Sequence, residues 1–126
     1  MFTHMTVGAN DIEASRKFYD AVFGALGIAE GTPDTHGRVW WRTQRGSFGI
    51  TRPLDGQPAC HANGGTIGFG ARDPQAVEAF HVAGLAAGGT AIEDPPGLRK
   101  GDFGALYLAY LRDPSGNKIC ALHRPS

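Results

Sequence analysis

The chain carries a weak internal repeat, and this repeat constrains its fold more than any other feature. The segments Thr3–Asp11 and Gly65–Asp73 both alternate apolar and polar residues, and both end in Gly-Ala-x-Asp, 62 residues apart. Such alternation predicts a half-buried strand, and apolar residues near helical spacing follow each segment. The repetition of one strand-and-helix unit predicts two structurally similar halves.

Both expected helices have well-marked ends. Asp11 and Asp73 can each accept hydrogen bonds from the free N–H groups of a first helical turn. Pro74 suits the first helical position, because it has no N–H to leave unpaired. Two adjacent glycines form a natural stop for the second helix, and Gly24 or Gly27 does the same for the first.

Three short strand candidates follow each helix, separated by turns rich in glycine, proline, aspartate and asparagine. We predict strands at Gly27–Glu30, Arg38–Arg42, Ser47–Thr51, Thr90–Glu93, Leu106–Arg112 and Asn117–His123. The chain is then a single domain of two βαβββ modules, about 1–52 and 65–126, joined by an aperiodic linker at 53–64. This is an α+β fold in which the modules form an open, curled mixed sheet with a shared concave pocket.

The composition argues against several classes of partner. Twelve Lys and Arg balance twelve Asp and Glu, so no basic excess indicates nucleic acid and no polybasic run indicates a membrane surface. No apolar run approaches the ~18 residues that span a bilayer. The N-terminus lacks the pattern of a signal peptide, so we expect a cytoplasmic protein whose two cysteines are free thiols.

The segment from Tyr107 to His123 is predicted to form two strands joined by the tight turn Asp113-Pro-Ser-Gly-Asn117. With the duplication, this hairpin resembles the vicinal oxygen chelate superfamily of glyoxalases, bleomycin-resistance proteins and extradiol dioxygenases over nearly the whole chain. The resemblance implies the two-module fold, a homodimer and a small-molecule pocket in the concave sheet. It also implies a divalent metal, held from the first and last strands of each module, that acts as a Lewis acid.

The metal-ligand positions that the resemblance implies are only partly filled by donor side chains. They fall on His4, near Phe48 or Ile50, on Thr66 and on Cys120. Thr66 stands where a histidine is common in the family, and Cys120 replaces the usual carboxylate. A catalytic site needs about three protein ligands, so this set favours a metal-free pocket over bound zinc, iron, nickel or manganese.

His4 and Cys120 are the candidate catalytic residues, and each has two interpretations. Strand alternation turns both side chains away from the helices, where the resemblance implies that they converge. They could bind one metal, or form a thiolate–imidazolium pair in which the histidine lowers the pKa of the thiol. The alternatives are an inert hydrogen-bonded histidine and a buried cysteine that behaves as a small apolar residue.

Aromatic residues on the expected strands are candidates for a platform on which a ligand stacks. The candidates are Trp40, Trp41, Phe48, Tyr107 and Tyr110. Alternation lets only some of them face the concavity, and the others join the core. Thr66 and Arg99 are further candidates for ligand binding. Arg99 lies on an expected loop before a strand of the concave sheet. There its side chain contacts either an anionic group of the ligand or solvent.

Three functions fit these residues, and the incomplete ligand set places metal-free binding of a small molecule first. The bleomycin-sequestering members of the family provide the parallel. The second function is a metal-dependent lyase, dioxygenase or thiol transferase of the glyoxalase type that uses His4. Thiol chemistry at Cys120 is the third. No phosphate-binding loop, dinucleotide fingerprint or HExxH motif indicates another chemistry.

Overall fold

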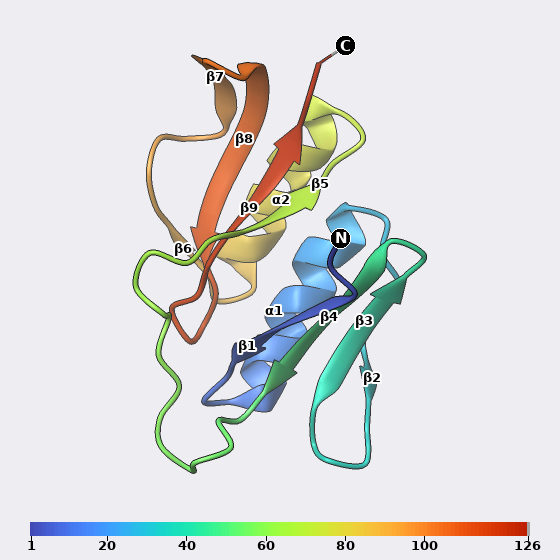
Figure 1. The fold of residues 1–126 in the computed structure, drawn as a ribbon. Coiled ribbons are helices and arrows are strands. Elements are labelled where there is room, and N and C mark those ends of the chain that lie inside the picture. The colour runs from blue at the N-terminus through green and yellow to red at the C-terminus, as the bar shows by residue number, and fades with distance from the viewer. Residues whose placement is uncertain (126) are drawn as a thin grey trace.

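The computed structural model describes residues 1–125, which form two similar modules in an α+β arrangement (Figure 1). The first module consists of β1 (His4–Gly8), α1 (Ile12–Ala25), β2 (Thr32–Pro33), β3 (Val39–Thr43) and β4 (Gly46–Thr51). The second consists of β5 (Ile67–Gly70), α2 (Pro74–Ala86), β6 (Thr90–Ala91), β7 (Gly97–Gly101), β8 (Gly104–Arg112) and β9 (Lys118–His123). The predicted βαβββ modules are confirmed, and the second module has one additional strand, β7, paired to β8.

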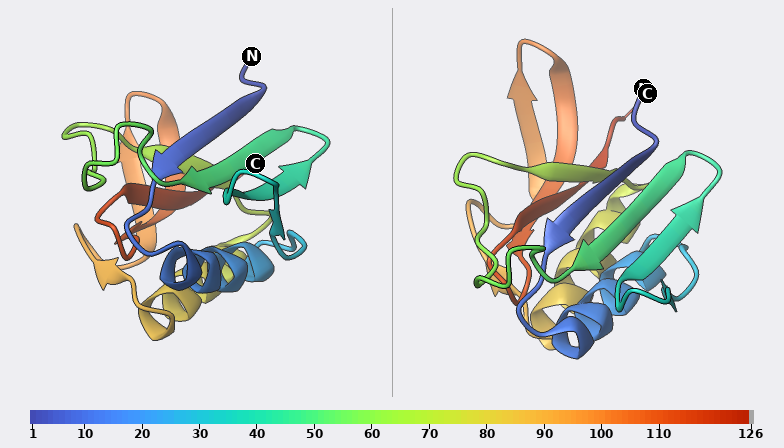
Figure 2. Two further views of the ribbon diagram at one scale, coloured as in Figure 1. Left: turned by 90° about the horizontal axis from the view of Figure 1, so that it is seen from below. Right: turned by 60° about the horizontal axis from the view of Figure 1, so that its bottom comes forward.

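Each module builds its own open, mixed sheet. The four-stranded sheet has the order β1-β4-β3-β2, and the five-stranded sheet has the order β5-β9-β8-β6, with β7 also paired to β8. The first strand of each module is parallel to the last, and the other pairs are antiparallel. Both helices lie on the same side of the sheets, so each sheet has one face free of helix (Figure 2).

The helix ends follow the expected capping chemistry. Asp11 Oδ1 accepts a hydrogen bond from Ala14 N at 3.0 Å, and Asp73 caps α2 in the same way. Gly24 remains within α1, so Gly27 is the glycine that ends this helix. Gly27 has a φ of 81°, a left-handed conformation that glycine adopts at little cost.

One apolar core lies between the two helices and the two sheets. The largest of its fully buried side chains are Trp41, Tyr19, Phe18, Phe23, Phe80, Ile50, Leu111 and Ile119. The rings of Phe23 and Phe69 lie 4.8 Å apart between centroids, which joins α1 to the first strand of the second module. On β9, Ile119 and Ala121 face this core as strand alternation predicts.

A buried polar network also joins the modules. Asp113, in the turn between β8 and β9, is 4% exposed and accepts a hydrogen bond from Tyr19 Oη on α1 at 2.6 Å. Asn117 Nδ2 donates to Asp113 Oδ2 at 2.8 Å and to the carbonyl of Gly8 on β1 at 2.9 Å. The turn therefore satisfies its buried polar groups with partners in the first module, as buried polar atoms require.

Two strand predictions and one loop prediction need correction. Gly27–Glu30 is not a strand, because the chain leaves α1 with Ile28 N bonded back to Phe23 O at 2.9 Å, and β2 begins only at Thr32. The sixth strand stops at Ala91, two residues before Glu93, whose φ of 60° is incompatible with an extended strand. Residues 97–101 form β7 and not a loop, because they pair with the start of β8.

Candidate functional site

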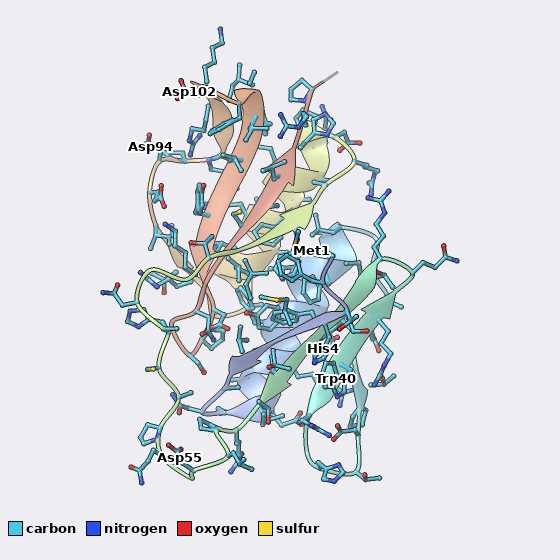
Figure 3. All side chains as sticks on the ribbon, viewed as in Figure 1. Met1, His4, Trp40, Asp55, Asp94 and Asp102 are labelled. Carbon is cyan, nitrogen blue, oxygen red and sulfur yellow. The ribbon has the colours of Figure 1, made fainter. Side chains whose placement is uncertain are left out.

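The helix-free face of the first sheet centres on His4 and Trp40, which come from β1 and β3 and lie beside each other (Figure 3). The two rings meet edge to face with centroids 6.0 Å apart, and His4 Nδ1 lies 2.9 Å from Thr3 Oγ1. The Trp40 ring lies across Gly49, where an added Cβ would be 2.7 Å from the ring. Gly49 therefore lets the indole lie flat on the sheet.

The surroundings of Trp40 hold it in one orientation. Its Nε1 donates to Asp34 Oδ2 at 3.0 Å, and the guanidinium carbons of Arg38 and Arg42 lie 5.8 and 5.5 Å from the ring centroid. Burial acts to raise the pKa of Asp34, but hydrogen bonds from Trp40, His36 and Arg38 hold that pKa well below its usual range. Trp40 is thus an oriented aromatic surface in a cationic environment.

The helix-free face of the second sheet is mainly apolar. Cys120 is 5% exposed and packs with Leu106, Leu108, Tyr110 and Leu122. Burial raises the pKa of the Cys120 thiol to about 11, although the nearby Lys118 acts in the opposite direction. This shift is opposite to the one that a thiolate–imidazolium pair requires, so the structure does not support that pair.

Lys118 and Glu93 form an ion pair at the margin of this apolar face, and the Lys118 ammonium lies 4.9 Å from the centroid of the Tyr110 ring. Burial is the main reason why the pKa of the Tyr110 phenol is raised. Tyr110 therefore remains a neutral hydroxyl on this face over the physiological pH range.

The two candidate catalytic residues have different neighbours. His4 contacts Thr3 and Trp40 in the first sheet, whereas Cys120 is paired with Gly68 and Tyr110 in the second. Among residues 1–125, no three His, Cys, Asp or Glu side chains are grouped closely enough to hold a metal ion. The donor set within one chain therefore does not fit the divalent metal that the fold implies.

A cleft of about 790 Å³ lies between the two modules. On one wall are the start of β1 and the turn between β3 and β4, and on the other are the end of β5 and the residues that follow it. The floor of the cleft is formed by the apolar side chains Phe23, Leu26, Ile28, Trp41, Phe48 and Phe69. Its basic lining residues in the described part of the chain are His4, Arg45 and Arg72, and no Asp or Glu of that part lines it.

The structure distributes the predicted ligand-binding residues over several places. Trp41 and Phe48 belong to the core and also form part of the cleft floor. Tyr107 faces α2, where its hydroxyl donates to Glu78 Oε1 at 2.5 Å. Thr66 is exposed and lies just before β5. Neither Tyr107 nor Thr66 lines the cleft.

Arg99 requires a correction, because it lies on β7 and not on a loop. Its register partner is Leu106, and its Nη2 donates to the carbonyl of Asp94 at 3.0 Å. Sequence reasoning also missed two residues of the cleft mouth, Arg45 and Arg72. Arg72 occupies the variable position of the repeated Gly-Ala-x-Asp motif, where the first copy has Asn10. This difference between the two copies is the sequence feature that could have identified Arg72 as a candidate.

A sequence model of the Glyoxalase/Bleomycin resistance protein/Dioxygenase superfamily matches residues 2–121. The chain belongs to this superfamily. No curated protein matches the chain in sequence. A crystal structure of a glyoxalase/bleomycin resistance protein from Albidiferax ferrireducens T118 is 59% identical, with a TM-score of 0.96 over 98% of this chain and 99% of that one.

More distant superfamily structures share the fold. A glyoxalase-related enzyme from Fulvimarina pelagi is 18% identical, with a TM-score of 0.72 over 99% of this chain and 88% of that one. A lactoylglutathione lyase from Agrobacterium tumefaciens is 22% identical, with a TM-score of 0.66 over 98% and 92%. At these identities the likeness concerns the fold, because one fold supports many different sites.

Proposed function

We propose that this superfamily member binds a small molecule in the cleft between its modules, and that it does so without a metal. The cleft carries the proposal, because its volume of about 790 Å³ lies within the range of ~300–1,000 Å³ that is usual for small-molecule pockets. Its apolar floor and few polar lining groups are also typical of such pockets. His4 is part of this site, which extends from the cleft to the oriented ring of Trp40.

The proposal of binding without a metal is supported by the donor chemistry. His4 is the one strong metal donor at the predicted ligand positions, while Cys120 is buried and Thr66 and Ser47 are weak ligands. A metal-dependent lyase, dioxygenase or transferase needs an open metal site with about three protein ligands. We therefore favour binding over the metal-dependent alternative.

A cleft-filling variant tests the proposal. An added Cβ at Gly70 meets nothing within 4 Å, so Gly70→Leu should place its side chain in the cleft without disturbing the fold. The probe is Nile red, a neutral dye whose fluorescence rises in apolar sites. Gly24→Leu is the matched control, because a Cβ there also meets open space and Gly24 lies outside the cleft.

We expect saturable dye binding by the natural protein and by Gly24→Leu, and at least about ten-fold weaker binding by Gly70→Leu, which corresponds to ~1.4 kcal/mol. Binding should be unchanged by a chelator. Equal binding by the natural protein and Gly70→Leu would refute the cleft as the site. Dye binding that requires added zinc would restore the metal-dependent alternative.

We also propose that the protein is a cytoplasmic homodimer. Large apolar side chains are exposed at the N-terminus and on the β7–β8 hairpin, where Phe2 is 69% and Phe103 is 59% exposed, and such residues are often covered by a partner. No helix of the described residues could cross a membrane. Light scattering after size-exclusion chromatography would test the dimer, and cell fractionation would test the location.

A further inference from the structure

The mouth of the cleft is electrostatically one-sided. Among residues 1–125, His4, Arg45 and Arg72 line the cleft, and no acidic side chain does. The chain as a whole is balanced, with twelve basic and twelve acidic residues, so this asymmetry is local. The uncharged polar residues Thr43, Gln44 and Ser47, in and beside the β3–β4 turn, complete this wall. The mouth can therefore attract an anion without repulsion from a carboxylate in the cleft.

Arg45 supplies a cation that is not committed elsewhere. It is exposed in the turn between β3 and β4, and its guanidinium forms no ion pair or hydrogen bond with another residue of the described part of the chain. Its own backbone N–H is bonded to Thr43 Oγ1 at 3.1 Å, which holds the turn in place. The turn is thus ordered, while the charged end of the side chain is available to a ligand.

Arg72 supplies a second cation from the opposite module. Its Nε lies 3.4 Å from Asp73 Oδ2, but the side chain is 69% exposed, so this pair is weak. The other carboxylate oxygen of Asp73 caps α2 through Ala76 N. Arg72 Nη1 also lies 3.8 Å from the position of an added Cβ on Gly27, so the guanidinium reaches across to the end of α1. The two arginines therefore border the cleft from its two walls.

The floor beneath these cations is aromatic. Phe69 lies 4.8 Å from Phe23 and 5.3 Å from Phe48, measured between ring centroids, and all three rings line the cleft. These contacts are edge-to-face, which leaves ring surfaces and edges for an apolar group to pack against. A ligand that fits both the aromatic floor and the cationic mouth has an apolar body and a negatively charged end.

We infer that the ligand of the cleft is an amphipathic carboxylate, with an aliphatic or aryl body on the aromatic floor and its carboxylate between Arg45 and Arg72. Guanidinium groups suit this role because they match carboxylate geometry and are weakly hydrated. This inference rests on the proposed binding function and adds the chemical class of the ligand.

The experiment compares two probes that differ only in the head group, octanoate and 1-octanol, by isothermal titration calorimetry. The variants are Arg45→Gln, Arg72→Gln and the control Arg52→Gln, which removes the same charge just after β4 and outside the cleft. We expect octanoate to bind more tightly than octanol to the natural protein. Each cleft variant should weaken octanoate by about 5-fold, as for one partly exposed ion pair, and leave octanol unchanged.

The outcomes separate the two proposals. If octanoate and octanol bind equally well, or if Arg52→Gln weakens octanoate as much as Arg45→Gln does, the inference of a carboxylate ligand is overturned while binding in the cleft stands. If neither probe binds and Nile red does not bind, both proposals are overturned. Octanoate binding that weakens in high salt, with octanol binding unaffected, would support the cationic mouth.

Discussion

The buried hydrogen bond between Tyr19 and Asp113 gives a direct test of how the two modules are held together. Tyr19 is fully buried, and its hydroxyl donates to the Asp113 carboxylate at 2.6 Å. A hydrogen bond to a charged group contributes about 1.5–3 kcal/mol. Because Asp113 keeps its donors from Ser115 and Asn117, we expect Tyr19→Phe to lower the free energy of unfolding by about 2 kcal/mol.

Tyr107 provides a matched control. Its hydroxyl also donates to a carboxylate, that of Glu78 at 2.5 Å, but in an exposed setting on the side of α2. Water can replace this bond, so Tyr107→Phe should lower the free energy of unfolding by less than about 1 kcal/mol. Urea unfolding measures both variants. Equal losses, or a loss below about 0.5 kcal/mol for Tyr19→Phe, would refute the argument from burial.

The same bond predicts a dependence on alkaline pH. Burial, and then the charge and hydrogen bond of Asp113, raise the pKa of Tyr19 well above its usual value. A group whose pKa is raised by folding stabilises the protein below its unfolded pKa and loses that contribution as the pH rises. The free energy of unfolding should therefore fall as the pH rises above ~10. It should fall less steeply in Tyr19→Phe, and identical slopes would contradict the mechanism.

Two further predictions concern packing and thiol reactivity. Gly84→Ala would place a Cβ 2.3 Å from Leu111 Cδ1 and should cost about 1–3 kcal/mol, whereas Gly24→Ala meets open space in α1 and should stabilise by about 0.5–1 kcal/mol. Thermal unfolding would show opposite shifts, and shifts of the same sign would contradict this account. With a pKa of about 11, Cys120 is roughly 0.1% thiolate at pH 8, so a thiol reagent should label Cys60 in the native protein and Cys120 only on unfolding. Rapid labelling of both cysteines would show that Cys120 is accessible and ionised.

Local patterns predicted much of the fold. The caps Asp11 and Asp73 mark the true starts of both helices, and the Asp113–Asn117 turn joins the last two strands. These features depend on neighbours in sequence, which propensity and capping describe well. The repeat at an offset of 62 residues then predicts that the second half copies the first.

Strands that depend on a partner were harder to predict. The segment Gly97–Gly101 contains two glycines and two basic residues and has no apolar alternation, yet it forms β7. Its hydrogen bonds with β8 supply the stabilisation, and backbone pairing is not visible in side-chain type. Likewise, alternation alone left open which of Trp40 and Trp41 is buried, and the register with β4 decides that Trp41 enters the core.

The sequence by itself determined the superfamily, the two modules and the face on which His4 and Cys120 lie, because helical and strand periods act over a few residues. Only the tertiary structure decided that these two side chains have separate neighbours. It also decided that Arg45, Phe69 and Arg72 border one cleft. Those residues meet because the helices and core aromatic side chains pack together and set the spacing of the two sheets, and packing between distant segments has no local signature in the chain.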